Sequence, residues 1–252
     1  MSIKIYGNTR FGPTATSAAS LITTNMLLYL DASNPTSYPG SGTTWTDLST
    51  NTNDVTLVNG PTYSSANGGK IIFDGVDDWG NSALAKQGSS TGNYTFGAWV
   101  KPNDITGAAN HFLGRGGYEN SFYNGWSFLL TFSSGKPGAS VVTMSPSIVG
   151  AGTPAGTRTV STDGWYYVVG VWTAGTSLKL YLNGTLEATL NTSGTNLRQS
   201  NFYGWTLATV IQTQYASTEL GAVHVYNTVL TDSEILQNFN ATKARFPLGT
   251  IT

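Results

Sequence analysis

Apolar and polar residues alternate along most of the chain with the period of a β-strand. In NYTFGAWVK, residues 93–101, the even-numbered positions form one apolar face, and Trp99 lies on the other. In GWYYVVGVW, residues 164–172, both faces are apolar, which predicts a central strand covered on each side. The run MLLYLDAS, residues 26–33, ends in turn formers and predicts another buried strand. Frequent Gly and Asn clusters between such runs predict an all-β sandwich.

The clearest local signal is a hairpin in SLKLYLNGTLEATL, residues 177–190. Leucines at 178, 180 and 182 share one face, and Asn183-Gly184 then predicts a tight turn with positive φ at both residues. The apolar face is expected to resume at 186, 188 and 190. GAVHVYN, residues 221–227, predicts a further strand.

One helix is expected near the end of the chain, in LTDSEILQNFNA. Thr231 lies three residues before Glu234, which predicts a capping box in which each side chain bonds the other residue's backbone N–H. Ile235 and Phe239 follow on one face. The pattern therefore predicts a short C-terminal helix that packs on the sheet.

The chain divides into one domain and two short ends. Residues 25–246 keep the β pattern without an internal repeat or a linker. Residues 1–24 are rich in Thr, Ser, Ala and Gly and are interpreted either as an extended arm or as a disordered tail, and residues 247–252 form a C-terminal tail. The first 24 residues lack the apolar segment of a secretory signal, and no stretch approaches the roughly 18 apolar residues of a membrane span.

Composition narrows the classes of protein. Charged residues make up 10% of the chain, the net charge is −1, and there are no cysteines, so disulfides and thiolate metal sites are excluded. No basic run is present, which argues against nucleic-acid and membrane partners. A polar surface built from Thr, Ser, Asn and Gly is typical of extracellular and virion proteins.

Three aspartates lie within five residues of IIFDGVDDW, residues 71–79. Asp74, Asp77 and Asp78 in a glycine-containing turn are compatible with a metal site, a catalytic pair, or a hairpin turn that caps itself. Calcium takes six to eight oxygen ligands, and carboxylates supply them readily. The residues alone leave these alternatives open.

Several stretches together resemble the laminin-G-like branch of the concanavalin A-like lectin/glucanase superfamily. They run in the family's order over roughly residues 25–246: LLYLDASNPTSYPGSGTTWTDLSTNTNDVTLVNGPTY, IIFDGVDDW, YTFGAWVKP, DGWYYVVGVWTAGTSLKLYLNG and LGAVHVYNTVLTDSEILQNFNATKARF. The resemblance implies a jelly-roll sandwich of two antiparallel sheets, one of them concave. Domains with this opening phrase are associated with phage structural proteins.

The resemblance also implies a calcium site and argues against catalysis. Related laminin-G-like domains bind calcium through loop Asp and Asn residues, so Asp47, Asn51 and Asn53 are expected near the acidic turn. Glucanases of the superfamily use paired glutamates with a Glu-x-Asp-x-x-Glu type of spacing. The four glutamates, Glu119, Glu187, Glu219 and Glu234, lack such partners, and Asp232 before Glu234 is explained by the helix cap.

Other catalytic motifs are missing as well. His224 alternates with valines on a predicted strand and is interpreted as a packed or exposed sheet histidine, while His111 lies between a loop and a strand. Neither is accompanied by a nucleophile elbow. GRGG at 114–117 lacks the lysine and the helix of a phosphate loop.

Sugar binding is the remaining chemical possibility. A glycine-rich stretch at 114–126 and a second stretch, NFYGWT, combine aromatic and small polar side chains, as adaptable binding loops do. The candidate ligands of a sugar are Arg115, Tyr118, Asn120, Tyr123, Trp126 and Trp205, with Asn124 and Tyr203 beside them. The competing interpretation is that large aromatics fill the core, as expected for Trp99, Trp165 and Trp172.

These observations favour a non-enzymatic surface protein of a bacteriophage virion, as a capsid decoration or a fibre component. The virion is the expected location, after synthesis in the host cytoplasm. The arm would bind other virion proteins, the domain would bind host-surface glycans, and a homo-oligomer is possible. The alternative is a stand-alone lectin module assisted by calcium, and a glycoside hydrolase is the least favoured class.

Overall fold

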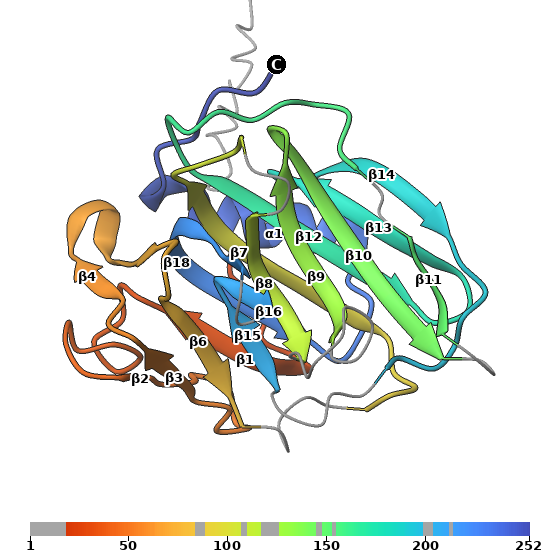
Figure 1. The fold of residues 1–252 in the computed structure, drawn as a ribbon, viewed down its shortest axis with the longest axis horizontal. Coiled ribbons are helices and arrows are strands. Elements are labelled where there is room, and N and C mark those ends of the chain that lie inside the picture. Colours follow the sequence, from red (N-terminus) through yellow and green to blue (C-terminus); the bar gives the residue numbers. More distant parts are fainter. Residues whose placement is uncertain are drawn as a thin grey trace, which may run out of the picture.

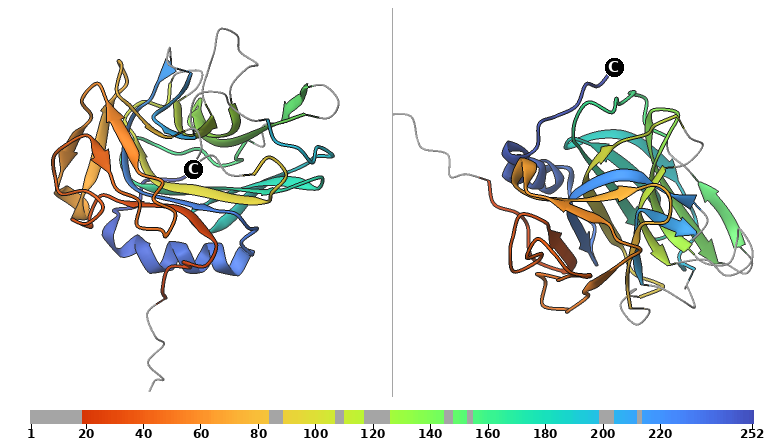
Figure 2. Two further views of the ribbon diagram at one scale, coloured as in Figure 1. Left: turned by 90° about the horizontal axis from the view of Figure 1, so that it is seen from below. Right: turned by 60° about the vertical axis from the view of Figure 1, so that its left-hand side comes forward.

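The computed structural model describes residues 19–83, 89–106, 110–116, 126–144, 148–152, 155–198, 204–211 and 214–252. Two antiparallel sheets pack face to face, and one α-helix covers the outer side of one sheet (Figures 1 and 2). The all-β sandwich predicted from the strand pattern is therefore confirmed.

The first sheet, sheet A, has the strand order β14-β13-β12-β7-β18-β5-β4, with β1 pairing with β18 next to β5. Its strands are β1 (Met26–Asp31), β4 (Thr62–Ser64), β5 (Lys70–Asp74), β7 (Tyr94–Pro102), β12 (Tyr166–Thr173), β13 (Ser177–Leu182), β14 (Thr185–Asn191) and β18 (Ser217–Tyr226). A 3₁₀ turn, η1 (Ala66–Gly68), connects β4 to β5.

The second sheet, sheet B, has the order β11-β10-β9-β8-β15-β6-β3-β2. Its strands are β2 (Thr44–Trp45), β3 (Val55–Val58), β6 (Trp79–Ser82), β8 (Asn110–Gly116), β9 (Trp126–Ser133), β10 (Lys136–Met144), β11 (Ile148–Gly152) and β15 (Trp205–Leu207). A separate small ribbon is formed by β16 (Thr209–Ile211) and β17 (Gln214–Tyr215).

The main core lies between the two sheets, and a second core lies between sheet A and the helix α1 (Asp232–Thr242), which η3 (Lys243–Arg245) follows. Phe96 of β7 stacks on Phe128 of β9 in the main core, with ring centroids 4.6 Å apart. On the other face of β7, Trp99 stacks on Phe246 at 4.3 Å. The prediction that β12 buries both faces is confirmed, and the structure shows that β7 is buried on both faces as well.

The predicted hairpin is present, with Asn183 at φ 51° and Gly184 at φ 80° between β13 and β14. The expected apolar face of the second strand is wrong at its start, because Leu186 is 42% exposed. The pairing register shifts between Leu180 and Tyr181, and β14 lies at the edge of sheet A with little burial.

The helix begins at the predicted capping box. The Thr231 hydroxyl accepts the N–H of Glu234 at 3.3 Å, and the Glu234 carboxylate accepts the N–H of Thr231 at 2.8 Å. Ile235 and Phe239 are buried against sheet A, so the predicted docking of this helix is confirmed. In the described part of the chain, no helix is long and apolar enough to cross a membrane.

Both ends of the described chain are bound to the domain. Ile22 donates its N–H to Asn238 Oδ1 at 2.8 Å and accepts the Tyr226 hydroxyl at 2.9 Å, so the packed unit already includes residues that the sequence assigns to an arm. Residues 1–18 lie outside the described part. At the other end, Leu248 bridges to Trp165 and Ile251 to Val160, so residues 247–252 are part of the fold instead of a free tail.

Candidate functional site

The acidic turn at 74–78 connects the two sheets. β5 pairs with β18 and β4 in sheet A, whereas β6 pairs with β3 and β15 in sheet B. The interpretation of Asp74-Gly75 as a hairpin turn is therefore wrong. Gly75 has φ 81°, and a Cβ there would lie 2.9 Å from the backbone nitrogen of Ser217, so this crossing requires glycine.

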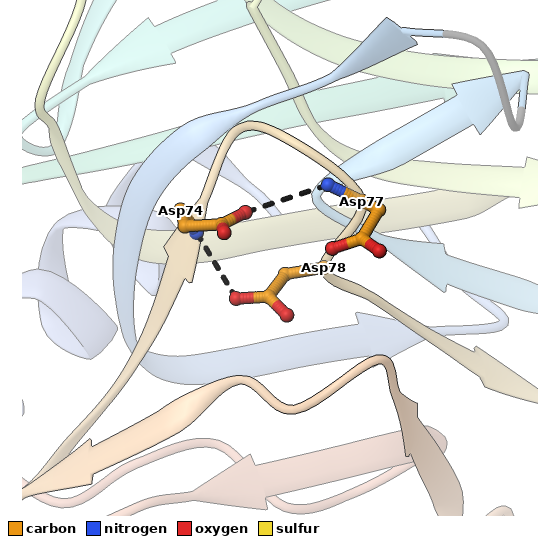
Figure 3. Close-up of side chains that lie close together, drawn as sticks. All are labelled: Asp74, Asp77 and Asp78. Atoms are coloured by element: carbon orange, nitrogen blue, oxygen red, sulfur yellow. Dashed lines mark hydrogen bonds between the residues drawn. The ribbon is translucent and has the colours of Figure 1, made fainter.

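The turn brings its three carboxylates together, as Figure 3 shows. Asp74, Asp77 and Asp78 each offer a carboxylate oxygen, and these oxygens lie within 4.8 Å of one another. Asp74 and Asp77 are exposed, while Asp78 is only 5% exposed. We refer to these residues as the acidic triad.

Part of the acidic triad's hydrogen-bonding capacity stabilises the turn. Asp74 Oδ1 accepts the N–H of Val76 at 2.7 Å, and Asp78 Oδ2 accepts the N–H of Asp74 at 3.2 Å. The Asn59 carboxamide donates to the carbonyl of Asp77 at 2.9 Å. In the described chain, Asp74 Oδ2, Asp78 Oδ1 and both Asp77 oxygens have no hydrogen-bond partner. The turn therefore caps itself and still presents carboxylate oxygens.

The local electrostatics favour a cation at the acidic triad. Burial raises the pKa of Asp78 above its ordinary value, and the charges of Asp74 and Asp77 raise this pKa further, against the lowering effect of the Asp74 N–H. Exclusively oxygen donors suit a hard cation such as calcium and do not suit zinc or copper. The acidic triad thus fits calcium in donor type and charge.

Asp47 and Asn53 have a different role from the one predicted. The Asp47 carboxylate accepts the backbone N–H groups of Tyr29 and Asn53, each at 2.8 Å, and also bonds Ser49. The carboxamide of Asn53 donates to the carbonyl of Leu27. These two side chains hold the 47–53 loop against the free edge of β1.

The strand register separates this loop from the acidic triad. β3 pairs with β6 so that Val55 lies opposite Ser82 and Val58 lies opposite Trp79. The 47–53 loop precedes one end of this strand pair, and Asp78 precedes Trp79 at the other end. The predicted calcium shell that joins Asp47 and Asn53 to the acidic triad is therefore not formed. Asn51, whose carboxamide donates to the carbonyl of Met26 at 2.7 Å, belongs with the loop.

Two predicted sugar ligands are inside the sandwich. Arg115 is 0% exposed, donates to Ser127 Oγ at 2.8 Å and to the carbonyl of Ser89 at 2.9 Å, and lies 5.2 Å from the Tyr94 ring centroid. Burial lowers the pKa of Arg115 to about 10. Trp205 is also 0% exposed and lies in the main core. Neither side chain can reach a sugar at the surface, so these two assignments are wrong.

The other predicted sugar ligands lie outside what the structure describes. Tyr118, Asn120 and Tyr123 are outside the described residues, as are Asn124 and Tyr203. Trp126 begins β9, and only its backbone is described. Their proposed contact with a sugar stays a prediction.

Both histidines lie in surroundings that disfavour the charged form of the ring. His224 is 1% exposed, its Nδ1 lies 3.3 Å from the Tyr167 hydroxyl, and burial lowers its pKa to about 4. The packed interpretation of this residue is confirmed. Burial likewise lowers the pKa of His111, to about 4.

Sequence reasoning missed a cleft of about 520 Å³ at the edge of sheet A, which we call the β1 cleft. The residues that line it come from three separated segments: Thr23, Asn25, Met26, Leu27, Tyr29, Leu48, Ser49, Thr50, Asn51 and Asn227. A second cleft of about 460 Å³ is formed by residues 103–106, 159–162, 250 and 252. Neither cleft has a local sequence signal, because each exists only after distant strands pair.

The sequence matches one protein family over most of its length. Residues 74–236, well over half of the sequence, match the family described as the Concanavalin A-like lectin/glucanases superfamily. The chain therefore belongs to this superfamily. No curated protein sequence matches it significantly.

Solved structures share the fold at low sequence identity. A mutant of Trypanosoma rangeli sialidase with trans-sialidase activity has a TM-score of 0.63 at 16% identity, over 90% of this chain and 34% of that one. The botulinum neurotoxin serotype D ligand-binding domain in complex with N-acetylneuraminic acid has a TM-score of 0.62 at 12% identity, over 85% and 50%. This chain thus spans about a third of the sialidase and half of the toxin domain.

A third structure matches over almost its full length. Domain 4 of AbnA, a GH43 extracellular arabinanase from Geobacillus stearothermophilus, in complex with arabinotriose, has a TM-score of 0.64 at 14% identity. The match covers 85% of this chain and 98% of that domain. At such identities the likeness establishes the shared fold.

Proposed function

We propose that this protein is a non-catalytic carbohydrate-binding domain displayed on the surface of a bacteriophage particle. The observation that carries the carbohydrate-binding part is the match to the arabinotriose-bound domain, which this chain covers over 98% of its length. Against the sialidase, the chain covers 34% of the enzyme. In length, the chain thus matches the whole arabinotriose-bound domain but only about a third of the sialidase.

The arrangement of carboxylates supports the absence of catalysis. In the described part of the chain, Glu187 pairs with Arg158, Glu219 pairs with Lys70 and Glu234 caps the helix. A retaining glycosidase needs two carboxyl groups about 5 Å apart on either side of a bound sugar. The acidic triad meets the distance but lies on a turn, and it lines neither of the two clefts described above.

We further propose that the acidic triad holds a calcium ion. Asp74, Asp77 and Asp78 would supply carboxylate oxygens, and solvent or a ligand would complete the six to eight positions that calcium requires. A bound ion would offset the mutual repulsion of the three carboxylates and stabilise the crossing between the two sheets. It would not take part in bond cleavage in a non-catalytic domain.

The proposal of a virion role has separate support. The polar surface residues are largely neutral, with 10% charged residues in the chain, and the opening phrase at 27–63 resembles phage structural proteins. Residues 1–18 precede the packed domain and would attach it to other virion proteins. Portal, capsid or tail genes next to the coding gene are the expected genomic context.

Two experiments test these parts separately. The purified protein is applied to a glycan array with calcium and with chelator, and binding to at least one class of saccharide is expected. Silence of the array in both conditions contradicts the carbohydrate-binding proposal. For the virion role, deletion of residues 1–18 is expected to abolish incorporation into particles while the melting temperature stays unchanged; normal incorporation contradicts it.

A further inference from the structure

We propose that the β1 cleft binds a neutral saccharide. This inference rests on the proposed carbohydrate-binding function and adds to it a location and a class of ligand. β1 pairs with residues 222–226 of β18 and has no further strand of the described chain on its other side in sheet A. The cleft lies where β1 meets the 48–51 loop and the connection between β18 and α1. Its volume of about 520 Å³ falls within the usual range of small-ligand sites.

Four polar side chains of the β1 cleft are available to a ligand. Asn25 and Asn227 lie opposite each other where β1 and β18 end, and the N–H of Asn227 donates to the carbonyl of Asn25 at 3.0 Å. Within the described chain, their carboxamides and the hydroxyls of Thr23 and Thr50 have no hydrogen-bond partner. A carboxamide has two donors and an acceptor, so it can bond two neighbouring hydroxyl groups of a sugar.

The β1 cleft also has apolar surface. Met26, Leu27 and Leu48 line it, together with the half-buried ring of Tyr29, which packs on His224 with centroids 5.2 Å apart. Apolar walls with a few placed polar groups are the general character of small-molecule sites. The C–H groups of a sugar ring match such walls, while its hydroxyls match the amides at the rim.

One wall of the β1 cleft is fixed before any ligand arrives. Leu48 donates its N–H to the carbonyl of Tyr29 at 2.8 Å, and Asn51 donates from its side chain to the carbonyl of Met26 at 2.7 Å. Ser49 donates its hydroxyl to Asp47 Oδ2 at 2.6 Å. A wall held in this way loses little conformational entropy on binding, which favours affinity for a small polar ligand.

The charge of the lining selects the ligand class. The described residues that line the β1 cleft include no Lys, Arg, His, Asp or Glu. Anionic groups such as carboxylates and phosphates are recognised by charge-assisted hydrogen bonds, usually from Arg or Lys. A sialylated or phosphorylated sugar would leave its charge uncompensated here, so the β1 cleft suits an uncharged saccharide.

The test combines variants of the β1 cleft with charged and neutral probes. Asn25→Gly removes one carboxamide while tolerating the φ of 59° at this position, and Asn227→Ala removes the other. Asn103→Ala is the matched control, because Asn103 is exposed and lines the second cleft. Binding of all proteins is measured on an array of neutral and sialylated glycans and by calorimetry with arabinotriose and with N-acetylneuraminic acid.

The expected result is binding of neutral glycans by the wild type and by Asn103→Ala, with a loss of at least about tenfold in the double variant. A thermal melt of each variant establishes that it is folded. If the wild type binds no glycan at all, the proposed function itself fails. If it binds glycans and the double variant binds equally well, the location is wrong while the function stands. Binding confined to sialylated glycans overturns the ligand class.

Discussion

At the scale of single residues, Asp78 differs from its two neighbours in the acidic triad. It is 95% shielded from solvent by the fold, yet its carboxylate lies beside two other carboxylates. The N–H of Asp74 satisfies one of its oxygens. The other oxygen has no hydrogen bond from the described chain, and a bound cation would offset the repulsion among the three carboxylates.

Calcium is expected to raise the melting temperature of the wild type, because an ion that binds only the folded state stabilises it by about 2.7 kcal/mol at a hundredfold excess over Kd. Asp77→Asn should remove this increase while the protein stays folded, since the Asp77 side chain makes no hydrogen bond in the described structure. Asp104→Asn is the control, because Asp104 is exposed and caps its own turn through Thr106. Melts in calcium and in chelator measure the effect, and identical curves for the wild type contradict the site.

His224 makes stability depend on pH. Its pKa is about 4 in the folded protein, against an ordinary value of 6.5, because burial disfavours the charged ring. Tyr167 and Tyr29 contact the ring, and the Asp31–Arg245 ion pair lies near it. Between pH 6.5 and 4 the unfolded state binds a proton that the folded state does not bind, so stability falls as pH is lowered through this window.

The expected contribution of His224 between pH 7 and pH 5 is about 2 kcal/mol, from 1.36 kcal/mol for each pH unit below 6.5. His224→Gln should lower stability at both pH values but reduce the difference between them by this amount. Urea unfolding at pH 5 and pH 7 measures both quantities. Parallel pH dependence in the two proteins contradicts the assignment of this effect to His224.

At the scale of elements, the sequence alone was sufficient to predict those features that depend on neighbouring residues. The Asn183-Gly184 turn, the Thr231–Glu234 capping box and the two-sided burial of β12 each depend on a few consecutive residues. The crossing at Asp74 was not predictable, because a turn within a hairpin and a turn between sheets can have the same residues. Only the pairing of β5 with β18, distant in sequence, distinguishes the two.

The same limit applies to side chains with two possible roles. Arg115 lies near the start of the glycine-rich stretch at 114–126, so its sequence context suits a binding loop as well as a core strand. Asp47 and Asn53 were identified as important polar residues, but their partners belong to β1, about twenty positions earlier. The chemistry of these residues was therefore predictable, whereas their location was not.

The loop at 47–53 stabilises an edge of sheet A, and this role has a distinct mutational signature. Asp47→Ala should destabilise the protein by about 2 kcal/mol or more, because it leaves N–H groups of Tyr29 and Asn53 without their charged acceptor. The calcium-dependent increase in melting temperature should persist in this variant. Chemical denaturation with and without calcium checks both points. Loss of the calcium effect in this variant would indicate that Asp47 is a ligand of the metal.

At the scale of the whole molecule, the C-terminal segment is hydrogen-bonded to residues 159–165 of the domain. Trp165 donates its N–H to the carbonyl of Pro247 at 2.9 Å, and Gly249 donates to the carbonyl of Trp165 at 3.2 Å. Thr250 bonds the Asp163 carboxylate through its N–H and its hydroxyl, at 2.9 and 2.6 Å. Hydrogen bonds from the Ser161 hydroxyl and from Thr250 to the Asp163 carboxylate lower the pKa of Asp163 to about 2. The last residues therefore complete the domain.

Deletion of residues 247–252 is expected to lower the melting temperature by several degrees, because it removes these backbone bonds together with those between Thr159 and Thr252. Leu248→Ala is the control and should change stability by no more than about 0.5 kcal/mol, since Leu248 is 49% exposed. Differential scanning calorimetry of the three proteins measures the difference. An unchanged transition in the deletion variant contradicts a structural role for this segment.

The attachment of residues 20–22 determines how the domain would carry a mechanical load. A pull at residue 19 acts first on the Ser20–Gln237 and Ile22–Asn238 hydrogen bonds at α1, and on the bond between Ile22 and Tyr226 at the end of β18. These contacts are on the helix side of sheet A (Figure 2). Tension applied there would detach a short segment from the helix before it separated any pair of strands, so the paired strands of both sheets would stay together under drag.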